Sequence, residues 1–130
     1  MTDEERNSII AYRIENSRNT LSEIPILVAN GFYNTAINRM YYACYYIASA
    51  LLIKNKISTH THEGVKLMIG KEFVLTGKLP NDLGKFYTKI YNRRLSGDYE
   101  DFFNNTKEIV EEYKPQAELF INTVESLINN

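Results

Sequence analysis

Residues 38–46 carry two different stripes when they are placed on a helix, and this double pattern strongly constrains the fold. One stripe is an apolar seam whose members recur at steps of three and four: Ala36, Ile37, Met40, Tyr41, Cys44, Ile47, Ala48, Leu51 and Leu52. The other stripe places Arg39, Tyr42 and Tyr46 at i, i+3 and i+7. Because a guanidinium and phenol hydroxyls need hydrogen-bond partners, this second face must meet another subunit, a ligand or water.

Composition indicates a single soluble domain that spans residues 1–130. The chain is 44% hydrophobic and 24% charged, and its net charge of −1 gives no overall attraction to nucleic acid or anionic membrane. The single cysteine, Cys44, has no partner for an internal disulfide, which fits a reducing compartment. The acidic N-terminus is not a secretory signal, and no uncharged run approaches the roughly 18 apolar residues of a membrane span. We therefore expect a cytoplasmic protein with no membrane association.

Helical periodicity continues through the first half of the chain. Thr2 and Glu5 have the spacing of a capping box, and a helix is predicted over residues 3–29 with a kink at Pro25. A second helix is predicted over 32–57 and a shorter one over 62–74. The link between the first two helices is so short that they must pack as antiparallel neighbours.

The second half predicts two more helices. One begins with Asn81 or Asp82 as its cap and reaches Arg94, and a polar loop is expected over 96–101. Asn105 and Glu108 have the spacing of another capping box, which opens a final helix that ends near residue 128. No strand-like alternation of useful length occurs. The predicted fold is all-α, an up-and-down four-helix bundle with one extra short helix.

The position of Arg94 has two interpretations. In the first, Arg94 is a cation in the last helical turn that can pair with Asp98 at i+4. In the second, Arg94 continues an apolar stripe, so its guanidinium would be half buried and could present a planar fork to phosphate, with Asp98 orienting it.

His62, in the first turn of its predicted helix, also has two interpretations. It is either a surface residue or a neutral imidazole that could hydrogen-bond a phosphate or a nucleotide edge. His60 and His62 lack the further ligands of a zinc site, so no metal and no cofactor are expected. Cys44 lies on the apolar face of its predicted helix and is interpreted as a small buried apolar residue.

The stripe of Arg39, Tyr42 and Tyr46 is interpreted first as a subunit interface, because Tyr and Arg are enriched at such surfaces. A ligand-binding pocket is the alternative. The first interpretation predicts a homodimer, and the second makes Arg39 and Tyr42 ligand-binding residues.

Three separated segments resemble the HEPN domain, the family named for nucleotide binding in higher eukaryotes and prokaryotes. They are Arg39-Met40-Tyr41-Tyr42-Ala43, Thr61-His62-Glu63-Gly64-Val65 and Arg94-Leu95-Ser96-Gly97-Asp98-Tyr99. Their order and spacing are similar to those of the small stand-alone prokaryotic members. The resemblance implies a helical bundle that forms homodimers and is often encoded beside a minimal nucleotidyltransferase, in pairs that behave as toxin and antitoxin.

Many proteins of the family are metal-independent ribonucleases whose Arg and His, four to six residues apart, face a dimer cleft. Here Arg94 matches the Arg, but Tyr99 stands five residues later and no His follows His62. A phenol with a pKa near 10 is a poor general base at neutral pH. In some family pairs a Tyr near this motif receives AMP from the nucleotidyltransferase, and Tyr99 is the nearest match.

The sequence thus predicts a nucleotide-binding or RNA-binding, toxin-like partner of a nucleotidyltransferase. Its cleft would be lined by five residues: Arg39, His62, Arg94, Asp98 and Tyr99. Arg94 would hold phosphate, and Tyr99 would be a phenol donor or a modification site. The alternatives are a metal-independent endoribonuclease in which His62 replaces the missing His, and a helical interaction module with no ligand.

Overall fold

The computed structural model describes the backbone of residues 1–99 and 104–130 and the side chains of residues 1–94 and 104–130. Its described part is all-helical and contains no strand, as the sequence predicts. The elements are α1 (Asp3–Ser22), α2 (Ile24–Ala29), α3 (Tyr33–Lys54), α4 (His62–Ile69), the π-helical turn η1 (Gly70–Val74), α5 (Asn81–Tyr99) and α6 (Lys107–Asn129).

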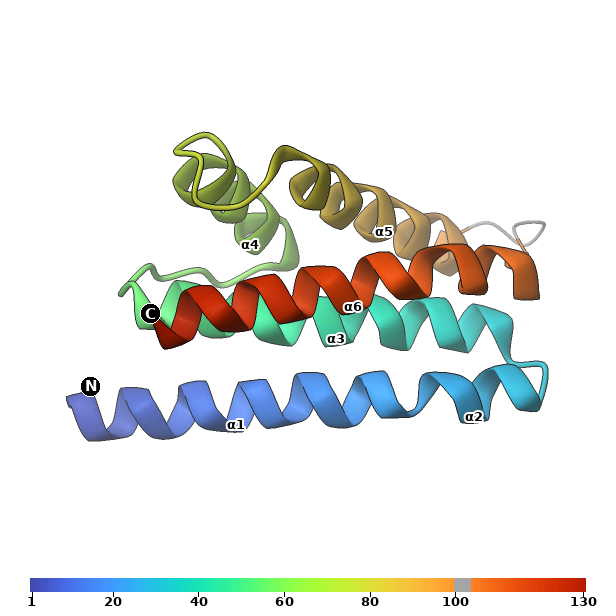
Figure 1. Cartoon of the computed structure of the whole chain (residues 1–130), viewed down its shortest axis with the longest axis horizontal. Helices are drawn as coiled ribbons and strands as arrows, with labels where there is room; N and C mark the ends of the chain where they lie inside the picture. The colour runs from blue at the N-terminus through green and yellow to red at the C-terminus, as the bar shows by residue number, and fades with distance from the viewer. Residues whose placement is uncertain (100–103) are drawn as a thin grey trace.

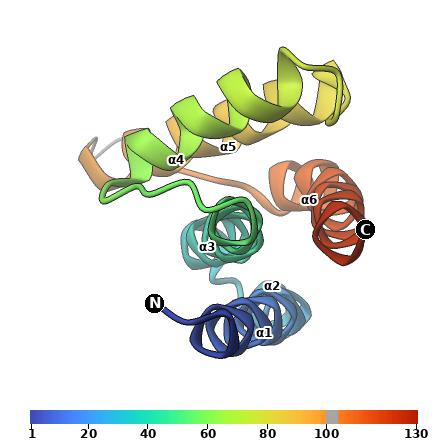
Figure 2. The same ribbon diagram turned by 90° about the vertical axis from the view of Figure 1, so that its left-hand side faces the viewer.

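The helices form three layers that are seen end-on in Figure 2. α1 and α2 lie on one side, α3 lies beside α6 in the middle, and α4 and α5 cover the other side (Figures 1 and 2). α3 is the central helix, and all nine of its predicted apolar positions are buried, as are the intervening small residues Ala43, Ser49 and Ala50. Because α3 packs on α1, α5 and α6, most of its circumference is dry.

The first predicted helix is interrupted near the expected kink. The capping box is present, since Glu5 N–H donates to Thr2 Oγ1 at 3.1 Å and the Glu5 carboxylate accepts from Thr2 N–H at 3.4 Å. α1 ends at Ser22, and α2 starts after Glu23 with Pro25 in its first turn. Proline has no N–H to continue the ladder of α1 but fits the first turn of a new helix, which explains a break here.

Close contact between α1 and α3 depends on small residues. Ser17 is fully buried, and its hydroxyl donates a 2.7 Å hydrogen bond to the Ala43 carbonyl. This bond satisfies a polar group that burial would otherwise leave unpaired. The predicted antiparallel packing of these two helices is confirmed (Figure 1).

The predicted end of α3 and the predicted cap of α5 are shifted, because α3 ends at Lys54 and α5 already begins at Asn81. Two other predicted boundaries are wrong. The cap of α6 is Thr106, whose hydroxyl accepts from Ile109 N–H at 3.3 Å, and not Asn105. Asn105 is instead buried, and its backbone and side-chain N–H groups donate to Asn34 Oδ1 at 2.8 and 3.0 Å while its own Oδ1 accepts from Arg93 Nε. Asn105 therefore joins α3 and α5 to the start of α6, a tertiary role that the local spacing does not reveal.

The second wrong boundary is the loop expected over residues 96–101. α5 remains helical to Tyr99, so residues 96–99 form its last turn. Residues 100 and 101 lie outside the described part of the chain. The polar composition of this segment predicts a loop, but a polar turn can extend a helix whose earlier turns are anchored in the core. The apolar stripe that Arg94 continues consists of Leu83, Phe86, Tyr87, Ile90 and Tyr91, and all five side chains are buried.

Candidate functional site

His62 is the first residue of α4, and the local sequence explains why. Thr61 has an extended backbone, with φ −136° and ψ 158°, and its hydroxyl accepts a 2.8 Å hydrogen bond from Gly64 N–H. This N-cap starts the helix at the next residue. His62 is half buried, because its ring enters a group of tyrosines on α3.

Three tyrosines of α3 surround the imidazole of His62. The Tyr45 ring stacks on it with centroids 4.1 Å apart, and the Tyr42 ring meets it edge-on at 5.5 Å. The Tyr41 hydroxyl forms a 2.7 Å hydrogen bond with Nδ1. The ring of His62 is therefore held in one orientation by two aromatic neighbours and one polar partner.

Arg94 reaches the same tyrosines from α5. The central carbon of its guanidinium lies 4.8 Å from the centre of the Tyr41 ring and 5.8 Å from that of Tyr42. Arg94 is half buried, as its register with the apolar stripe of α5 predicts. The tertiary structure thus places Arg94 and His62, which are 32 positions apart in the sequence, against a shared pair of aromatic rings. We call Tyr41, Tyr42, Tyr45, His62 and Arg94 the tyrosine cluster.

Arg94 is also one of the residues that line a polar pocket. The pocket has a volume of about 260 Å³, and it is lined by Asn34, Thr35, Ile37, Asn38, Arg93, Arg94 and Asn105. Amide and guanidinium groups dominate this lining, and none of the lining residues whose side chains the structure describes carries a carboxylate. Such a set of donors suits an anionic ligand.

Burial and charge together keep His62 neutral at physiological pH. Partial burial lowers the pKa of His62, and the nearby positive charge of Arg94 lowers it further. Burial raises the pKa of Tyr41, so the hydroxyl that bonds to His62 stays protonated.

The hydrogen bond between Tyr41 and His62 determines what the other ring nitrogen can do. If the Tyr41 hydroxyl donates to Nδ1, then Nε2 carries the proton and is a donor to phosphate oxygen. If Nδ1–H donates to the Tyr41 oxygen, then Nε2 has a free lone pair and can accept a proton. The same arrangement therefore suits either anion binding or base catalysis.

The electrostatic coupling of Arg94 and His62 can be measured by NMR titration of the two histidine rings. We expect His62 to titrate below the ordinary pKa of about 6.5. Replacing Arg94 by methionine should raise the pKa of His62, because the repelling charge is removed while the side-chain bulk is retained.

Assignment is direct because the chain has two histidines and the His60→Gln variant removes one signal. An unchanged pKa of His62 in the Arg94 variant would contradict the proximity of the two groups. Replacing Arg18, which pairs with Glu125 between α1 and α6, is the matched control and should leave the titration unchanged.

Arg39 lies outside the tyrosine cluster and contacts the break between α1 and α2. Its Nε and one terminal nitrogen donate to the two carboxylate oxygens of Glu23 at 3.0 and 2.9 Å, and a weaker bond of 3.4 Å reaches Thr20. The hydrogen bonding of Arg39 to the Glu23 carboxylate is the main reason that the pKa of Arg39 is raised. Tyr42 and Tyr46 remain half exposed on the same face of α3, with ring centroids 6.0 Å apart.

The predicted site residues thus separate into three groups. His62, Arg94 and Tyr42 come together in the tyrosine cluster, whereas Arg39 is engaged by Glu23. Asp98 and Tyr99 belong to the last turn of α5, and their side chains lie outside the described residues. Their suggested roles therefore stay predictions.

Two residues of the cluster were not singled out as site residues from the sequence. Tyr41 is fully buried and fits the apolar seam, so its role as the hydrogen-bond partner of His62 is hidden by its position. Tyr45 falls between the two stripes. The signal that could have indicated both is the repeated pair Tyr41-Tyr42 and Tyr45-Tyr46, which places four phenols on adjoining turns.

Other chemistry is poorly supported by the described side chains. Cys44 is fully buried, and burial raises the pKa of its thiol, which disfavours the thiolate needed for attack. Among these residues no group of three or more histidine, cysteine, aspartate or glutamate side chains is arranged to hold a metal ion. In the same part of the chain, none of the helices has both the length and the apolar character needed to cross a bilayer.

The bundle and its tyrosine cluster define a small all-helical domain, and sequence comparison identifies its family. The model of the HEPN domain matches residues 10–127, so this chain belongs to the HEPN domain family. A "UPF0332 protein" of Thermotoga maritima is 36% identical over 126 residues, which cover 97% of this chain and 96% of the relative.

Two relatives from Methanocaldococcus jannaschii carry names that refer to toxins. "Putative toxin MJ0605" is 34% identical over 115 residues, which cover 88% of this chain and 85% of the relative. "Putative toxin MJ0142" is 32% identical over 109 residues, with coverage of 84% and 74%. These similarities, together with the family match, support a toxin-like HEPN protein.

Proposed function

We propose that this protein is the toxin-like member of a toxin and antitoxin pair and that it binds RNA or a nucleotide through phosphate at Arg94. The observation that carries the proposal is that Arg94 both contacts the tyrosine rings and lines a polar pocket of about 260 Å³. A guanidinium offers phosphate a planar pair of donors, and the neighbouring rings offer surfaces on which bases can stack.

A ligand-free interaction module is less well supported than this binding role. Such a module would leave no cavity beside Arg94, whereas the structure has one there.

A second candidate function is metal-independent cleavage of RNA. It is favoured by one specific observation, the approach of His62 to the tyrosines that Arg94 also contacts. In such a reaction His62 Nε2 would accept the proton of a ribose 2′-OH, and the 2′-oxygen would attack the adjacent phosphorus. The P–O5′ bond would break, which leaves a 2′,3′-cyclic phosphate and a 5′-oxygen that takes its proton from a water molecule, while the proton on His62 returns to solvent. Arg94 would stabilise the negative charge on the phosphoryl oxygens.

The proposal includes two partners and a location. We place a homodimer contact on the face of α3 that carries Tyr42 and Tyr46, because half-exposed phenols beside a guanidinium are typical of interfaces. The protein would act in the cytoplasm beside a minimal nucleotidyltransferase, with Tyr99 as the acceptor of AMP. Sedimentation over a range of concentrations tests the dimer, and the mass of Tyr99-containing peptides after co-expression tests the modification.

The central experiment measures binding and cleavage of a structured RNA in the presence of chelator. Calorimetry should show that the Arg94→Ala variant binds RNA or a mononucleotide at least tenfold more weakly than the wild type, with an unchanged circular dichroism spectrum. The Arg18→Ala variant is the matched control, since its guanidinium pairs with Glu125 away from the cluster.

The same samples distinguish the two candidate functions. Intact RNA after incubation with a binding-competent wild type would reject the nuclease and leave the binding function. If the wild type binds neither RNA nor a mononucleotide, the phosphate-binding role of Arg94 fails.

A further inference from the structure

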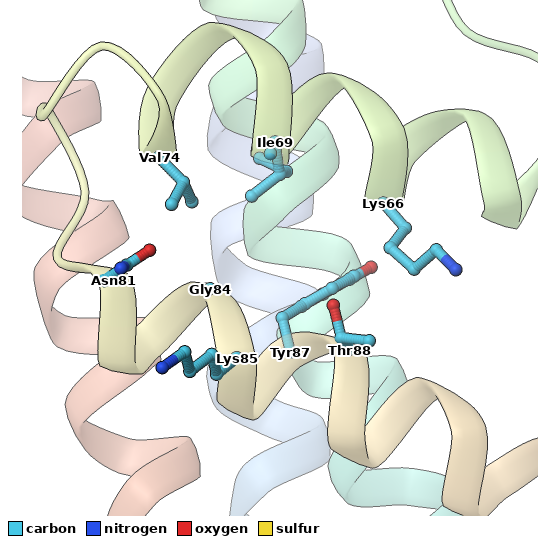
Figure 3. Close-up of a pocket in the computed structure, with 9 residues that line it drawn as sticks. Lys66, Ile69, Val74, Asn81, Gly84, Lys85, Tyr87 and Thr88 are labelled. Atoms are coloured by element: carbon cyan, nitrogen blue, oxygen red, sulfur yellow. The ribbon is translucent and has the colours of Figure 1, made fainter.

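A second pocket lies between α4 with η1 and the first half of α5 (Figure 3). Its volume is about 310 Å³, which falls at the lower end of the range for small-molecule sites. Ile69, Val74 and the ring of Tyr87 supply its apolar walls. It contains no residue of the tyrosine cluster and lies apart from the polar pocket beside Arg94.

Gly70 is the feature that suggests a use for this pocket. It lies on the pocket wall with ordinary helical dihedrals, φ −62° and ψ −50°, so its backbone does not require glycine. A Cβ added there would meet no atom within 4 Å. Glycine weakens a helix relative to alanine, and neither the backbone conformation nor the packing at Gly70 explains why glycine is present there. Because Gly70 has no side chain, this part of the pocket wall stays open.

The walls of the pocket come from α5 and from the π-helical turn. Gly84 lets α5 approach η1, because a Cβ at this position would lie 2.7 Å from Val74 Cγ2. The π-helical turn Gly70–Val74 forms the opposite wall, and such turns are often found at functional sites. If each non-hydrogen atom takes the volume that one water molecule occupies in the liquid, the pocket holds roughly ten non-hydrogen atoms.

The margin of the pocket is cationic. Lys66 from α4 and Lys85 from α5 line it with their ammonium groups directed outward at opposite ends, and Lys66 Nζ lies 4.5 Å from the centre of the Tyr91 ring (Figure 3). Asn81 and Thr88 of α5 add neutral polar groups to the lining. Within the described part of the chain, no acidic side chain lines this pocket. A ligand with an apolar body inside and an anionic group at this margin would match both the shape and the charge.

We propose that the pocket between α4, η1 and α5 binds a small aromatic or branched apolar molecule with a single anionic group, a carboxylate or a phosphate. The apolar body lies against Ile69, Val74 and Tyr87, and the anion contacts Lys66 or Lys85. The site is independent of the RNA-binding role proposed above, because none of the residues assigned to that role lines it.

The proposal is tested with a matched pair of probes, 1-naphthoate and its neutral isostere 1-naphthamide, by calorimetry on the full chain. We expect saturable binding of naphthoate with a Kd of about 1 mM or tighter, and at least fivefold weaker binding of the amide. The Lys66→Gln/Lys85→Gln double variant should remove this preference. Lys89→Gln is the control, because Lys89 lies on the same helix but over the Tyr113 ring.

Two substitutions at Gly70 separate occupation of the pocket from loss of the fold. Gly70→Leu should fill the space and weaken naphthoate binding at least tenfold, with a Tm that is no lower than that of the wild type. Gly70→Ala should retain binding, since one methyl group leaves most of the volume. The proposal is overturned by unchanged binding to Gly70→Leu, by equal affinity for the two probes, or by no saturable binding to the wild type. RNA binding is measured separately, so either proposal can fail alone.

Discussion

Replacing His62 by alanine is expected to lower the rate of RNA cleavage by about 10² to 10⁴-fold in chelator, the contribution usual for a general acid or base. The imidazole is the only described titratable group of the tyrosine cluster that is neutral, basic and close to Arg94, because the pKa of His62 is lowered by burial and by that arginine. RNA affinity should fall much less, since Arg94 and the polar pocket remain. Single-turnover cleavage of a labelled RNA, with the affinity measured in parallel, checks both expectations.

The matched control is His60→Ala, which removes an exposed histidine two residues away. Its cleavage rate should equal that of the wild type. Tyr41→Phe gives a further test, because it removes the 2.7 Å hydrogen bond to Nδ1 but keeps the aromatic ring. A rate that falls while affinity is retained would identify Tyr41 as a positioning residue. Equal cleavage by wild type and His62→Ala would refute the nuclease role of His62 and leave the binding role of Arg94 intact.

Replacing Phe120 by alanine is expected to have the largest effect on stability, a loss of about 3 to 5 kcal/mol in the free energy of unfolding. The Phe120 side chain is 0% exposed at the centre of α6. Its ring stacks on Tyr87 with centroids 5.2 Å apart and meets Phe86 at 6.5 Å, so it joins α6 to α5. Alanine removes the buried apolar surface and leaves a cavity between helices that cannot close fully.

Leu119→Ala is the control for this substitution because it changes the neighbouring position, whose side chain is 56% exposed. Its effect should stay within about 0.5 kcal/mol. Urea unfolding followed by circular dichroism measures both variants. Similar midpoints for the two would contradict the packing of α6 against α5.

Much of the fold could be predicted because helix periodicity and capping are local properties. The steps of three and four in α3 and α5 identify their buried positions, and the Thr2 and Glu5 spacing identifies the start of α1. Asn105 shows where this kind of reasoning fails. Its spacing to Glu108 is that of a capping box, but its hydrogen bonds go to Asn34 on α3 and Arg93 on α5. A partner 71 residues away cannot be inferred from local spacing.

The candidate site shows the same division. The register of Arg94 on α5 indicates that its side chain is half buried. The position of His62 in the first turn of α4 singles it out in the same way. That the two side chains meet on Tyr41 and Tyr42 depends on how α4 and α5 are packed over α3. The engagement of Arg39 by Glu23 also depends on packing, since it needs the break after α1 to lie beside α3.

By itself, the sequence determined that this chain is an all-helical domain, where most of its helices lie, and which of their faces are apolar. These features follow from the backbone geometry of a helix and from side chains within a few residues of one another. Only the tertiary structure decided which polar residues form a site. The reason is geometric. The angle and separation of the packed helices bring together an imidazole, a guanidinium and phenols that are far apart along the chain.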